Sequence, residues 1–351
     1  MMTSVTHVRR PHDDLTVVNS ARVSFAKESA WGPTPGVMAE RDKNLLAYLN
    51  RNGHWSPFAH PQMVFIREMP TDRLTEYLAD QSHGFRRLIV RHRGGRTLFV
   101  ERGSLWGYLN APRFIDTALA DAIIRRYPNT VEARNGIAMS SALPKSEDLS
   151  DFIQDEDGLA TALADAGVHL DEPALAHLLV ATYRIKAPIY VARQLVKHQR
   201  DLVWNETSRR YVDTPPEYQI STTWRKRADN LKQGSSDEVF TNDTRTLLGS
   251  LQPGGDAGVL NSWAREAVAV ADGAYREMIA ARVAPEQARE ILPLNTLTEW
   301  YWTGSADAWN RVVGQRTDSH AQSETQAPAV EINRTLTEAM PKVWAALRVP
   351  S

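Results

Sequence analysis

The sequence predicts an α+β protein, because strand-like and helix-like patterns alternate along a chain of 351 residues. Residues 59–70, 176–188 and 296–305 are rich in β-branched, aromatic and other apolar side chains, as strands are. Residues 260–283 instead repeat apolar side chains at the spacing of one helix face. The length suffices for one large domain or two ordinary ones.

The N-terminal part begins with a short alternating pattern. Residues 21–29 alternate apolar and polar side chains, which favours a strand that runs into a loop. Residues 41–53 predict a helix, and Gly53 stands where a glycine ends a helix. A turn then leads into the strand at 59–70. That strand is similar to the one at 176–188, since both begin with Ala-His and end on Pro, and chance similarity explains this better than a duplication.

The middle of the chain has a mixed character. Residues 85–96 are basic, and residues 103–114 are aromatic and rich in turn formers. Helices are predicted over 116–127 and 156–167, and the polar stretch 128–148 separates them.

The C-terminal part returns to strong patterns. Residues 212–219 form a proline-rich exit, and 227–246 predict a loop or mobile lid. Pro285 stands near the start of one further helix, as proline often does, whereas Pro328 should break or kink another. These further helices are predicted over 284–293, 307–316 and 319–326.

Composition excludes several classes of function. Lys and Arg number 41 and Asp and Glu 42, so the chain has no strong field for nucleic acid or an anionic membrane. Cysteine is absent, which removes disulfides, thiolate metal sites and thiol nucleophiles. The N-terminus has no signal-peptide pattern and no run reaches membrane-spanning length, so we expect a cytoplasmic protein without a metal site.

Residues 197–211, KHQRDLVWNETSRRY, gather an amide, a carboxylate, a hydroxyl and two guanidinium groups. If 205–211 form a helix, Glu206 and Arg210 share a face, and a simple exposed ion pair would be the plain interpretation. With Asn205 and Ser208 added, the set favours a pocket for an anion and a planar polar group, because guanidinium grips phosphate through paired bonds.

This stretch resembles the signature of the flavin-dependent thymidylate synthases, Arg-His-Arg, a spacer, then Asn-Glu-x-Ser-x-Arg-Tyr. Other blocks resemble the family in the same order: ARVSF, GHWSPFAH, APIYVARQ, REILPLNTLTEWYWTGS and RTDSHAQSE. The resemblance implies a family-like α+β core with an inserted subdomain. It divides the chain into a first core part at 1–70, an insertion on the rim of the core at 71–175, and a second core part at 176–351.

The resemblance also implies a reaction. Such enzymes convert dUMP to dTMP without an enzymic nucleophile, using FAD, NADPH and methylenetetrahydrofolate, which fits the missing cysteine. They assemble as homotetramers whose active sites are shared between subunits. Small molecules, dUMP and folate, are therefore the expected partners, and neither membrane nor nucleic acid is expected.

Roles follow where the residues match. Arg316 is implied to lie against the uracil and to stabilise charge that develops on the ring, so it is the candidate catalytic residue. The residues implied to bind dUMP are Gln194, Glu206, Ser208, Arg209, Arg210, Arg289 and Arg316. The residues implied to bind FAD are Ser24, His54, Ser56, Lys197, His198, Gln199, Asn205, Glu206 and His320. His60 is as readily a packing or capping residue.

The chain departs from the family pattern at several flavin-side positions. Lys197 and Gln199 replace arginines, so one bidentate fork and one charge are lost, although Arg200 could supply the charge. The spacer to Asn205 is also one residue longer than in the usual motif. Where better-known members carry Asn, Arg and Asn, this chain has Ser305, Asp307 and Arg311.

Three alternatives stay open. The chain could be a related one-carbon transferase that makes a different pyrimidine product, or a non-catalytic nucleotide-binding protein that has lost FAD. The basic residues 85–96 could bind nucleic acid, although the near-zero net charge of the chain disfavours this. Within them, 91–96 contain Arg-His-Arg without the rest of the signature, which favours a basic surface on the insertion, with a phosphate or folate-tail contact as the minor interpretation.

Overall fold

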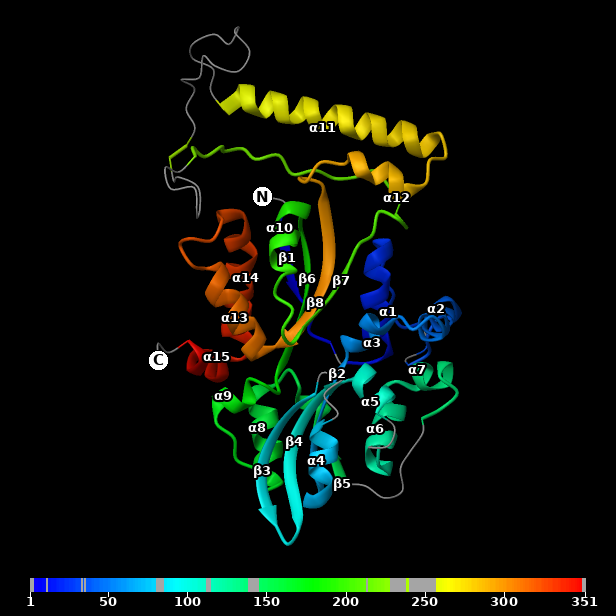
Figure 1. Cartoon of the computed structure of the whole chain (residues 1–351), viewed down its shortest axis with the longest axis vertical. Coiled ribbons are helices and arrows are strands. Elements are labelled where there is room, and N and C mark those ends of the chain that lie inside the picture. The colour runs from blue at the N-terminus through cyan, green and yellow to red at the C-terminus, as the bar shows by residue number, and fades with distance from the viewer. Residues whose placement is uncertain are drawn as a thin grey trace.

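The computed structural model confirms the α+β class, with two antiparallel sheets and helices packed around them (Figure 1). The structure describes residues 3–10, 12–32, 34, 36–79, 85–111, 115–137, 145–212, 214–227, 238–239 and 257–348. Most of the loop or lid predicted at 227–246 lies outside these residues. None of the described helices is both long and apolar enough to cross a membrane.

The first sheet, here called sheet A, has the strand order β1-β6-β8-β7. Its strands are β1 (Ser4–His7), β6 (Val180–Pro188), β8 (Leu297–Ser305) and β7 (Leu202–Glu206). The strands β6 and β8 pair along their whole length, with Val180 opposite Ser305 and Pro188 opposite Leu297. The strands predicted at 176–188 and 296–305 are therefore confirmed, and the structure pairs them with each other.

The second sheet, here called sheet B, has the order β3-β4-β2-β5. Its strands are β3 (Arg86–Arg93), β4 (Arg96–Ser104), β2 (Gln62–Pro70) and β5 (Lys145–Asp148). The similar strands β2 and β6 thus belong to different sheets. Because both partners of β2 come from residues 71–175, this segment builds a sheet around the end of the first core part, and the domain boundaries stay a prediction.

Helices cover both sheets. The N-terminal and middle ones are α1 (Asp14–Arg22), η1 (Val23–Phe25), α2 (Glu40–Arg51), α3 (Trp55–Ala59), α4 (Thr71–Ala79), α5 (Leu105–Asn110), α6 (Thr117–Arg126), α7 (Pro128–Ala133), η3 (Ser150–Phe152), α8 (Glu156–Asp165) and α9 (Glu172–Leu175). The later ones are α10 (Ile189–Leu195), α11 (Ala257–Ala280), α12 (Pro285–Ala288), η4 (Arg289–Ile291), α13 (Ala306–Arg316), α14 (Ser323–Ala339) and α15 (Pro341–Leu347).

The helices expected from long periodic patterns are confirmed. The helix predicted at 41–53 is α2, and Gly53 after it has φ +64°, a conformation that glycine adopts without strain. The pattern at 260–283 is α11, which stands away from the sheets in Figure 1. The remaining predicted helices correspond to α6, α8, α12 with η4, α13 and the start of α14.

Two expectations about local structure are wrong, and one stretch contains a helix that its sequence pattern did not indicate. Residues 21–25 end α1 and form η1 instead of a strand, because Val17, Val18 and Ala21 are buried at helical spacing. Residues 205–211 are not a helix, since β7 runs to Glu206 in the pairing register of β8. The stretch 103–114 contains a helix, α5, which the Ser104 side chain caps.

The expected break at Pro328 does not occur. The helix α14 continues through Pro328 to Ala339, with Pro328, Ala329 and Ile332 buried. Packing of this apolar face offsets the backbone hydrogen bond that proline cannot donate. The residues before Ser323, expected to be helical from 319, form a turn instead.

The core of sheet A is aromatic. Trp300, Trp302 and Trp309 are fully buried in one cluster that also takes in residues of β2, β4 and α8. Trp204 of β7 stacks on Trp300, with 4.4 Å between ring centroids, and meets Trp302 edge-on at 5.2 Å. This packing holds β7 against β8 and so fixes where the chain leaves the sheet after Glu206.

Candidate functional site

The segment that follows β7 is hydrogen-bonded to η1. The Thr207 hydroxyl donates to the Val23 carbonyl (2.8 Å), and the Ser208 amide donates to the Ser24 carbonyl (3.0 Å). In return the Ser24 hydroxyl donates to the Glu206 carbonyl (3.0 Å). Two blocks far apart in the sequence therefore meet at residues 206–208.

A cavity of about 610 Å³, here called the first cavity, opens at this meeting point. Its volume lies within the range of small-molecule sites. Of the predicted flavin residues it brings together Ser24, His54, Ser56 and Asn205, with Arg210 from the predicted dUMP set. The full lining is Ala21, Ser24, Phe25, Leu45, Tyr48, Leu49, Gly53, His54, Trp55, Ser56, Pro57, Asn205, Arg210 and Tyr211.

Aromatic contacts shape the first cavity. The Arg210 guanidinium lies 5.0 Å from the centre of the Tyr211 ring, and its Nε donates to the Ser208 hydroxyl (3.2 Å). The Tyr211 ring stacks on Phe25 at 5.1 Å. Both rings are among the exposed large side chains of the chain. The cavity therefore combines hydroxyl, imidazole, amide and guanidinium groups with flat apolar walls, which suits a planar polar ligand.

His60 lies directly behind the first cavity. Its Nε2 is hydrogen-bonded to Asn205 Oδ1 (3.3 Å) and its Nδ1 to the Thr303 hydroxyl (2.7 Å), which in turn meets the Thr182 hydroxyl (2.9 Å). Burial lowers the pKa of His60 to about 3, so the ring is neutral at physiological pH. The sequence left His60 open between packing and function, and its bond to Asn205 makes it a support of the cavity wall.

A second cavity, of about 580 Å³, lies on the other side of Glu206. Three predicted dUMP residues line it, Glu206, Arg209 and Arg289. The Glu206 carboxylate accepts from the Thr298 hydroxyl (2.7 Å) and the Trp204 indole (3.2 Å). Burial raises the pKa of Glu206, and these two hydrogen bonds oppose the shift.

Arg316, the candidate catalytic residue, is the last residue of α13 and contacts two other predicted residues. Its Nε donates to His198 Nε2 (2.9 Å), and its Nη2 donates to the Gln194 carbonyl (2.9 Å). Burial, with the charges of Arg316 and Arg311, lowers the pKa of His198 to about 4. A neutral His198 that accepts from Arg316 holds the guanidinium plane in one orientation.

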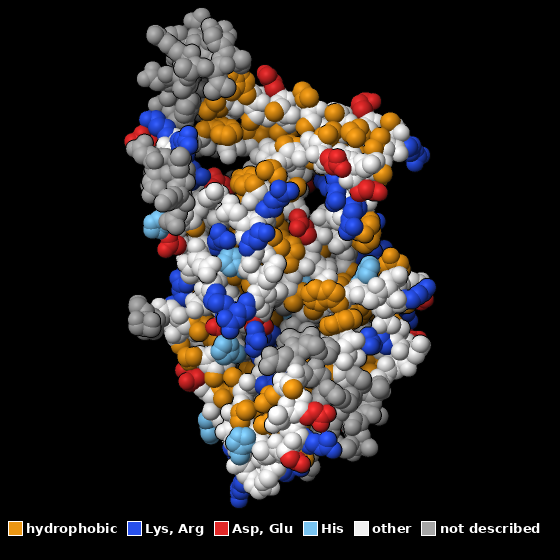
Figure 2. All heavy atoms as spheres, in the orientation of Figure 1, with side chains coloured by type: hydrophobic (Ala, Val, Ile, Leu, Met, Phe, Trp, Pro, Cys, Tyr) orange, Lys and Arg blue, Asp and Glu red, His pale blue; other side chains and the backbone are white. Residues whose placement is uncertain are grey.

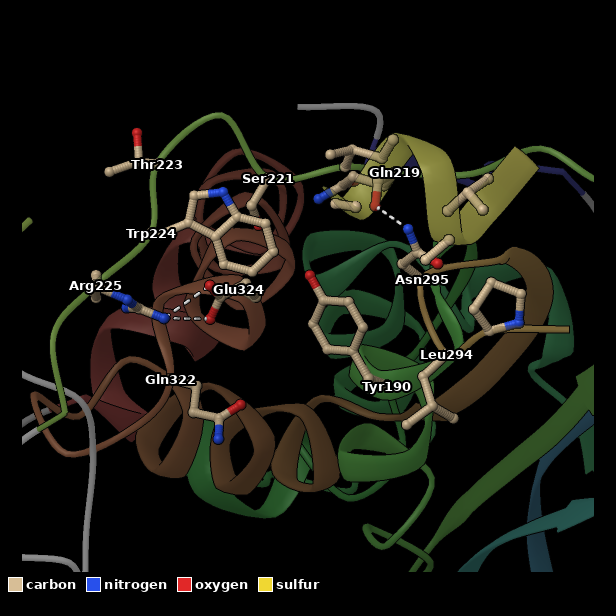
Figure 3. Close-up of a pocket in the computed structure, with 15 residues that line it drawn as sticks. Tyr190, Gln219, Ser221, Thr223, Trp224, Arg225, Leu294, Asn295, Gln322 and Glu324 are labelled. Atoms are coloured by element: carbon tan, nitrogen blue, oxygen red, sulfur yellow. Dashed lines mark hydrogen bonds and ion pairs between the residues drawn. The ribbon is translucent and has the colours of Figure 1, made fainter. Parts of the chain in front are cut away.

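A third cavity, of about 590 Å³, lies between α10, α11 and the start of α14 (Figure 3). Tyr190 and Trp224 line it, and Arg225 on its wall is paired with Glu324 at 2.7 and 2.8 Å. Because that pair neutralises itself, the cavity favours a neutral ligand over an anion. No residue of the predicted site lines it, although Gln322 in its wall accepts from the Gln194 side chain (2.6 Å).

Five predicted flavin residues do not line the first cavity. Two of them have been placed above, since His198 contacts Arg316 and Glu206 lines the second cavity. Lys197 is exposed, and Gln199 is exposed beside a separate cavity of about 400 Å³. His320 lies in the turn before α14, 70% exposed, and bonds to Asp318 (2.8 Å). In this chain alone these residues therefore form no common site with Ser24 and Asn205.

The unusual Asp307 has its charge balanced. It pairs with Arg311 one helical turn later in α13, and His177 lies 3.6 Å from it. Sequence reasoning noted both departures separately and missed that they compensate each other. Their spacing of four residues on a predicted helix was the available signal.

Comparison with known proteins decides the family. The family model described as "Thymidylate synthase complementing protein" matches residues 136–342. A flavin-dependent thymidylate synthase of Thermosipho africanus is 32% identical over 181 residues, which cover 51% of this chain and 72% of that protein. The chain belongs to the flavin-dependent thymidylate synthase family.

Further members of the family align over different lengths. A relative from Thermus thermophilus is 33% identical over 169 residues, and the match spans only 56% of that protein. The relative from Aquifex aeolicus is 27% identical over 320 residues, 89% of this chain and 90% of that protein. A solved UMP/dUMP methylase PolB from Streptomyces cacaoi, bound with 5-Br dUMP, is similar with a TM-score of 0.42 and 18% identity, covering 98% of this chain and 94% of that one.

Proposed function

We propose that this chain catalyses the reductive methylation of dUMP to dTMP with methylenetetrahydrofolate and NADPH through bound FAD. The observation that carries the proposal is the first cavity, where residues from two family-like blocks, Ser24 with His54 and Asn205 with Arg210, line one space. Family membership supplies the reaction class, and the cavity supplies a place for a planar cofactor beside an arginine.

In this proposal, Ser24, His54, Ser56 and Asn205 hold the flavin. Their hydroxyl, imidazole and amide groups can bond to a polar ring edge, and the apolar lining fits a flat ring. When bound, FAD supplies the hydride for the final reduction. His60 keeps the Asn205 amide in place from behind, and its neutral state leaves no charge beside the ring.

For dUMP, Glu206, Arg209 and Arg289 are the residues of the second cavity that offer complementary groups. The two guanidinium groups suit a phosphate, and the carboxylate of Glu206 suits an N–H donor. Arg316 is proposed to face the uracil and stabilise negative charge that develops on its ring. Neutral His198 supports this role, because it fixes Arg316 without cancelling its charge.

The proposal includes a homotetramer with shared sites. Within one chain, Arg316 lines neither the first nor the second cavity, which fits an arginine that serves another subunit. Figure 2 shows hydrophobic side chains along α11, and Val270 of this helix is 74% exposed. Exposed apolar rows of this kind are typical of surfaces that pair in assemblies. Light scattering of the purified protein measures its mass directly.

The test is release of label from dUMP tritiated at C5, with purified protein, FAD, NADPH and methylenetetrahydrofolate. We expect release that requires all three additions, and a product with the mass of dTMP. A matched comparison uses Arg289→Ala in the second cavity, which should weaken dUMP affinity about tenfold or more through the lost guanidinium. Its control is Arg334→Ala on the exposed face of α14, which should leave dUMP affinity unchanged.

Each other outcome points elsewhere. A product of a different mass would indicate the one-carbon transferase alternative. Folded protein that takes up no flavin would contradict the proposal and favour a nucleotide-binding protein. Unchanged dUMP affinity in Arg289→Ala would remove Arg289 from the residues that bind dUMP and leave the proposed reaction standing.

A further inference from the structure

The turn between His198 and Asn205 contains a residue with unusual backbone geometry. Asp201 has φ +61°, in the left-handed region, immediately before β7 begins at Leu202. Aspartate tolerates this region better than most side chains do. The strand β8 approaches the turn so closely that a Cβ on Gly304 would lie 2.9 Å from the Asp201 carbonyl oxygen. Close packing against β8 therefore constrains the backbone of the turn between the two halves of the signature.

Arg102 of β4 holds the side chain of Asp201. Its Nη2 donates to both carboxylate oxygens, at 2.6 and 2.7 Å, while Nη1 donates to the Gln62 side chain (2.6 Å). Its Nε donates to the His177 carbonyl (2.7 Å). The guanidinium is 2% exposed, so little solvent screens the pair. Burial raises the pKa of Asp201, but the charge and hydrogen bonds of Arg102, the Ser305 hydroxyl and the charge of Arg86 together outweigh burial and keep that pKa below its usual value.

Asp201 also connects to the helix that carries Arg316. The Ser305 hydroxyl donates to its carboxylate, and the same hydroxyl accepts from the Ala308 amide as the N-cap of α13. One carboxylate thus joins sheet B, the end of β8 and the start of α13. Ser305, one of the departures from the family pattern, therefore meets Arg102 of the segment 71–175 at Asp201, inside the lengthened spacer.

We propose that Arg102 is a positioning residue, contributed by the segment 71–175, which holds the Asp201 turn so that Asn205 stands correctly for flavin binding and His198 for its bond to Arg316. The inference rests on the proposed flavin-dependent function. A buried ion pair is costly to desolvate and is a poor source of stability by itself. The guanidinium of Arg102, bonded to Asp201, Gln62 and His177, instead fixes the geometry of the turn. In this chain the signature before that turn lacks two arginines of the usual motif.

The test measures FAD affinity by quenching of flavin fluorescence, alongside the thermal midpoint, for the full chain. Arg102→Lys keeps the charge but loses the fork, and Asp201→Asn keeps the left-handed residue but loses the charge. We expect each to weaken FAD binding about tenfold, as outer supports of bound groups do. The double variant should bind FAD with about the same affinity as either single variant, because both changes break the same ion pair between Arg102 and Asp201.

Arg67→Lys is the matched control. Arg67 is equally buried in the adjacent strand β2 and pairs with Glu101 (2.9 Å), but it contacts no part of the turn. It should lower the thermal midpoint and leave FAD affinity unchanged. Equal loss of affinity in Arg67→Lys would mean that general destabilisation explains the effect, and would overturn the proposal.

Two further outcomes separate this inference from the proposed function. If the unmodified chain binds FAD and forms dTMP while Arg102→Lys and Asp201→Asn bind FAD normally, the positioning role is wrong and the function stands. If the unmodified chain neither binds FAD nor forms dTMP, the function fails and this inference fails with it.

Discussion

The two sheets have the same number of strands and the same antiparallel pairing, but they treat buried polar groups differently. In sheet B, the Glu101 carboxylate accepts from Arg67 Nη1 (2.9 Å), from Arg87 Nε (2.6 Å) and from the Tyr77 hydroxyl. In sheet A, the buried interior holds tryptophan with uncharged hydroxyl side chains such as Thr182 and Thr303, and Asn205 stands at the edge, facing a cavity.

The difference separates structural charge from charge kept for ligands. The charged groups inside sheet B are already hydrogen-bonded to one another, so few of their donors and acceptors are available to a ligand. Removing one of these groups leaves the others buried without a partner of opposite charge. Polar groups at the edge of sheet A face cavities of about 580 and 610 Å³ instead. The three predictions that follow test this contrast, from the largest expected effect to the smallest.

Arg67→Met should cause the largest loss of stability. It leaves the Glu101 charge buried with fewer partners, which costs about 3–5 kcal/mol. Urea unfolding measures the free energy of unfolding directly. The exposed variant Arg334→Met, which removes surface pairs with Glu331 and Glu338, should change the free energy of unfolding little, because solvent screens these pairs. A similar cost for both variants would contradict the distinction between the sheets.

Arg316→Ala should act on turnover instead of folding. Loss of a charge that stabilises the transition state lowers kcat by about 10²–10³, roughly 3–4 kcal/mol. FAD affinity and the free energy of unfolding should stay close to those of the unmodified chain. Single-turnover kinetics with flavin-loaded protein measure the effect. An unchanged rate would remove Arg316 from the chemical step.

Acid should destabilise the protein through its buried neutral histidines. The pKa of native His60 is about 3, below the value of about 6.5 for an unfolded histidine, so the unfolded chain binds more protons as the pH falls. Stability is therefore full above about pH 6.5 and is lost as the pH falls toward about 3, with about 2 kcal/mol lost through His60 at pH 5.

Unfolding of the His60→Gln variant at pH 7.5 and pH 5.0 measures this contribution. The variant should lose about 2 kcal/mol less between the two pH values than the unmodified chain does. Equal acid sensitivity in His60→Gln and the unmodified chain would mean that His60 is not buried in its neutral form.

The sequence predicted those parts of the fold that local patterns determine. The helix α2 and the strands β6 and β8 follow from periodicity and composition, and Gly53 from its place after a helix. Long-range pairing determined the rest. Asn205 and Glu206 are in a strand because they pair with Tyr301 and Trp300, which no local pattern at 205–211 reveals.

For the candidate site, the sequence predicted the residues that line the first cavity but not the contacts that support them. Resemblance placed Ser24, His54, Ser56 and Asn205 in one set, and these residues line one cavity. It could not supply the bond between Arg102 and Asp201, because the partners are 99 residues apart and Arg102 lies in the segment that the family pattern skips. Supports of a site that come from an insertion have no motif to reveal them.

The hydrogen-bonded chain from Thr182 through Thr303 and His60 to Asn205 has a direction. If Asn205 Oδ1 accepts from His60 Nε2, the proton is on Nε2, and Nδ1 must accept from the Thr303 hydroxyl. The polarity of this chain sets which end of the Asn205 amide remains for the first cavity, namely its N–H groups. A ligand atom that meets Asn205 there must therefore carry a lone pair. Through His60, the hydroxyl of Thr303 in the centre of sheet A thus selects which edge of a heterocycle can face Asn205.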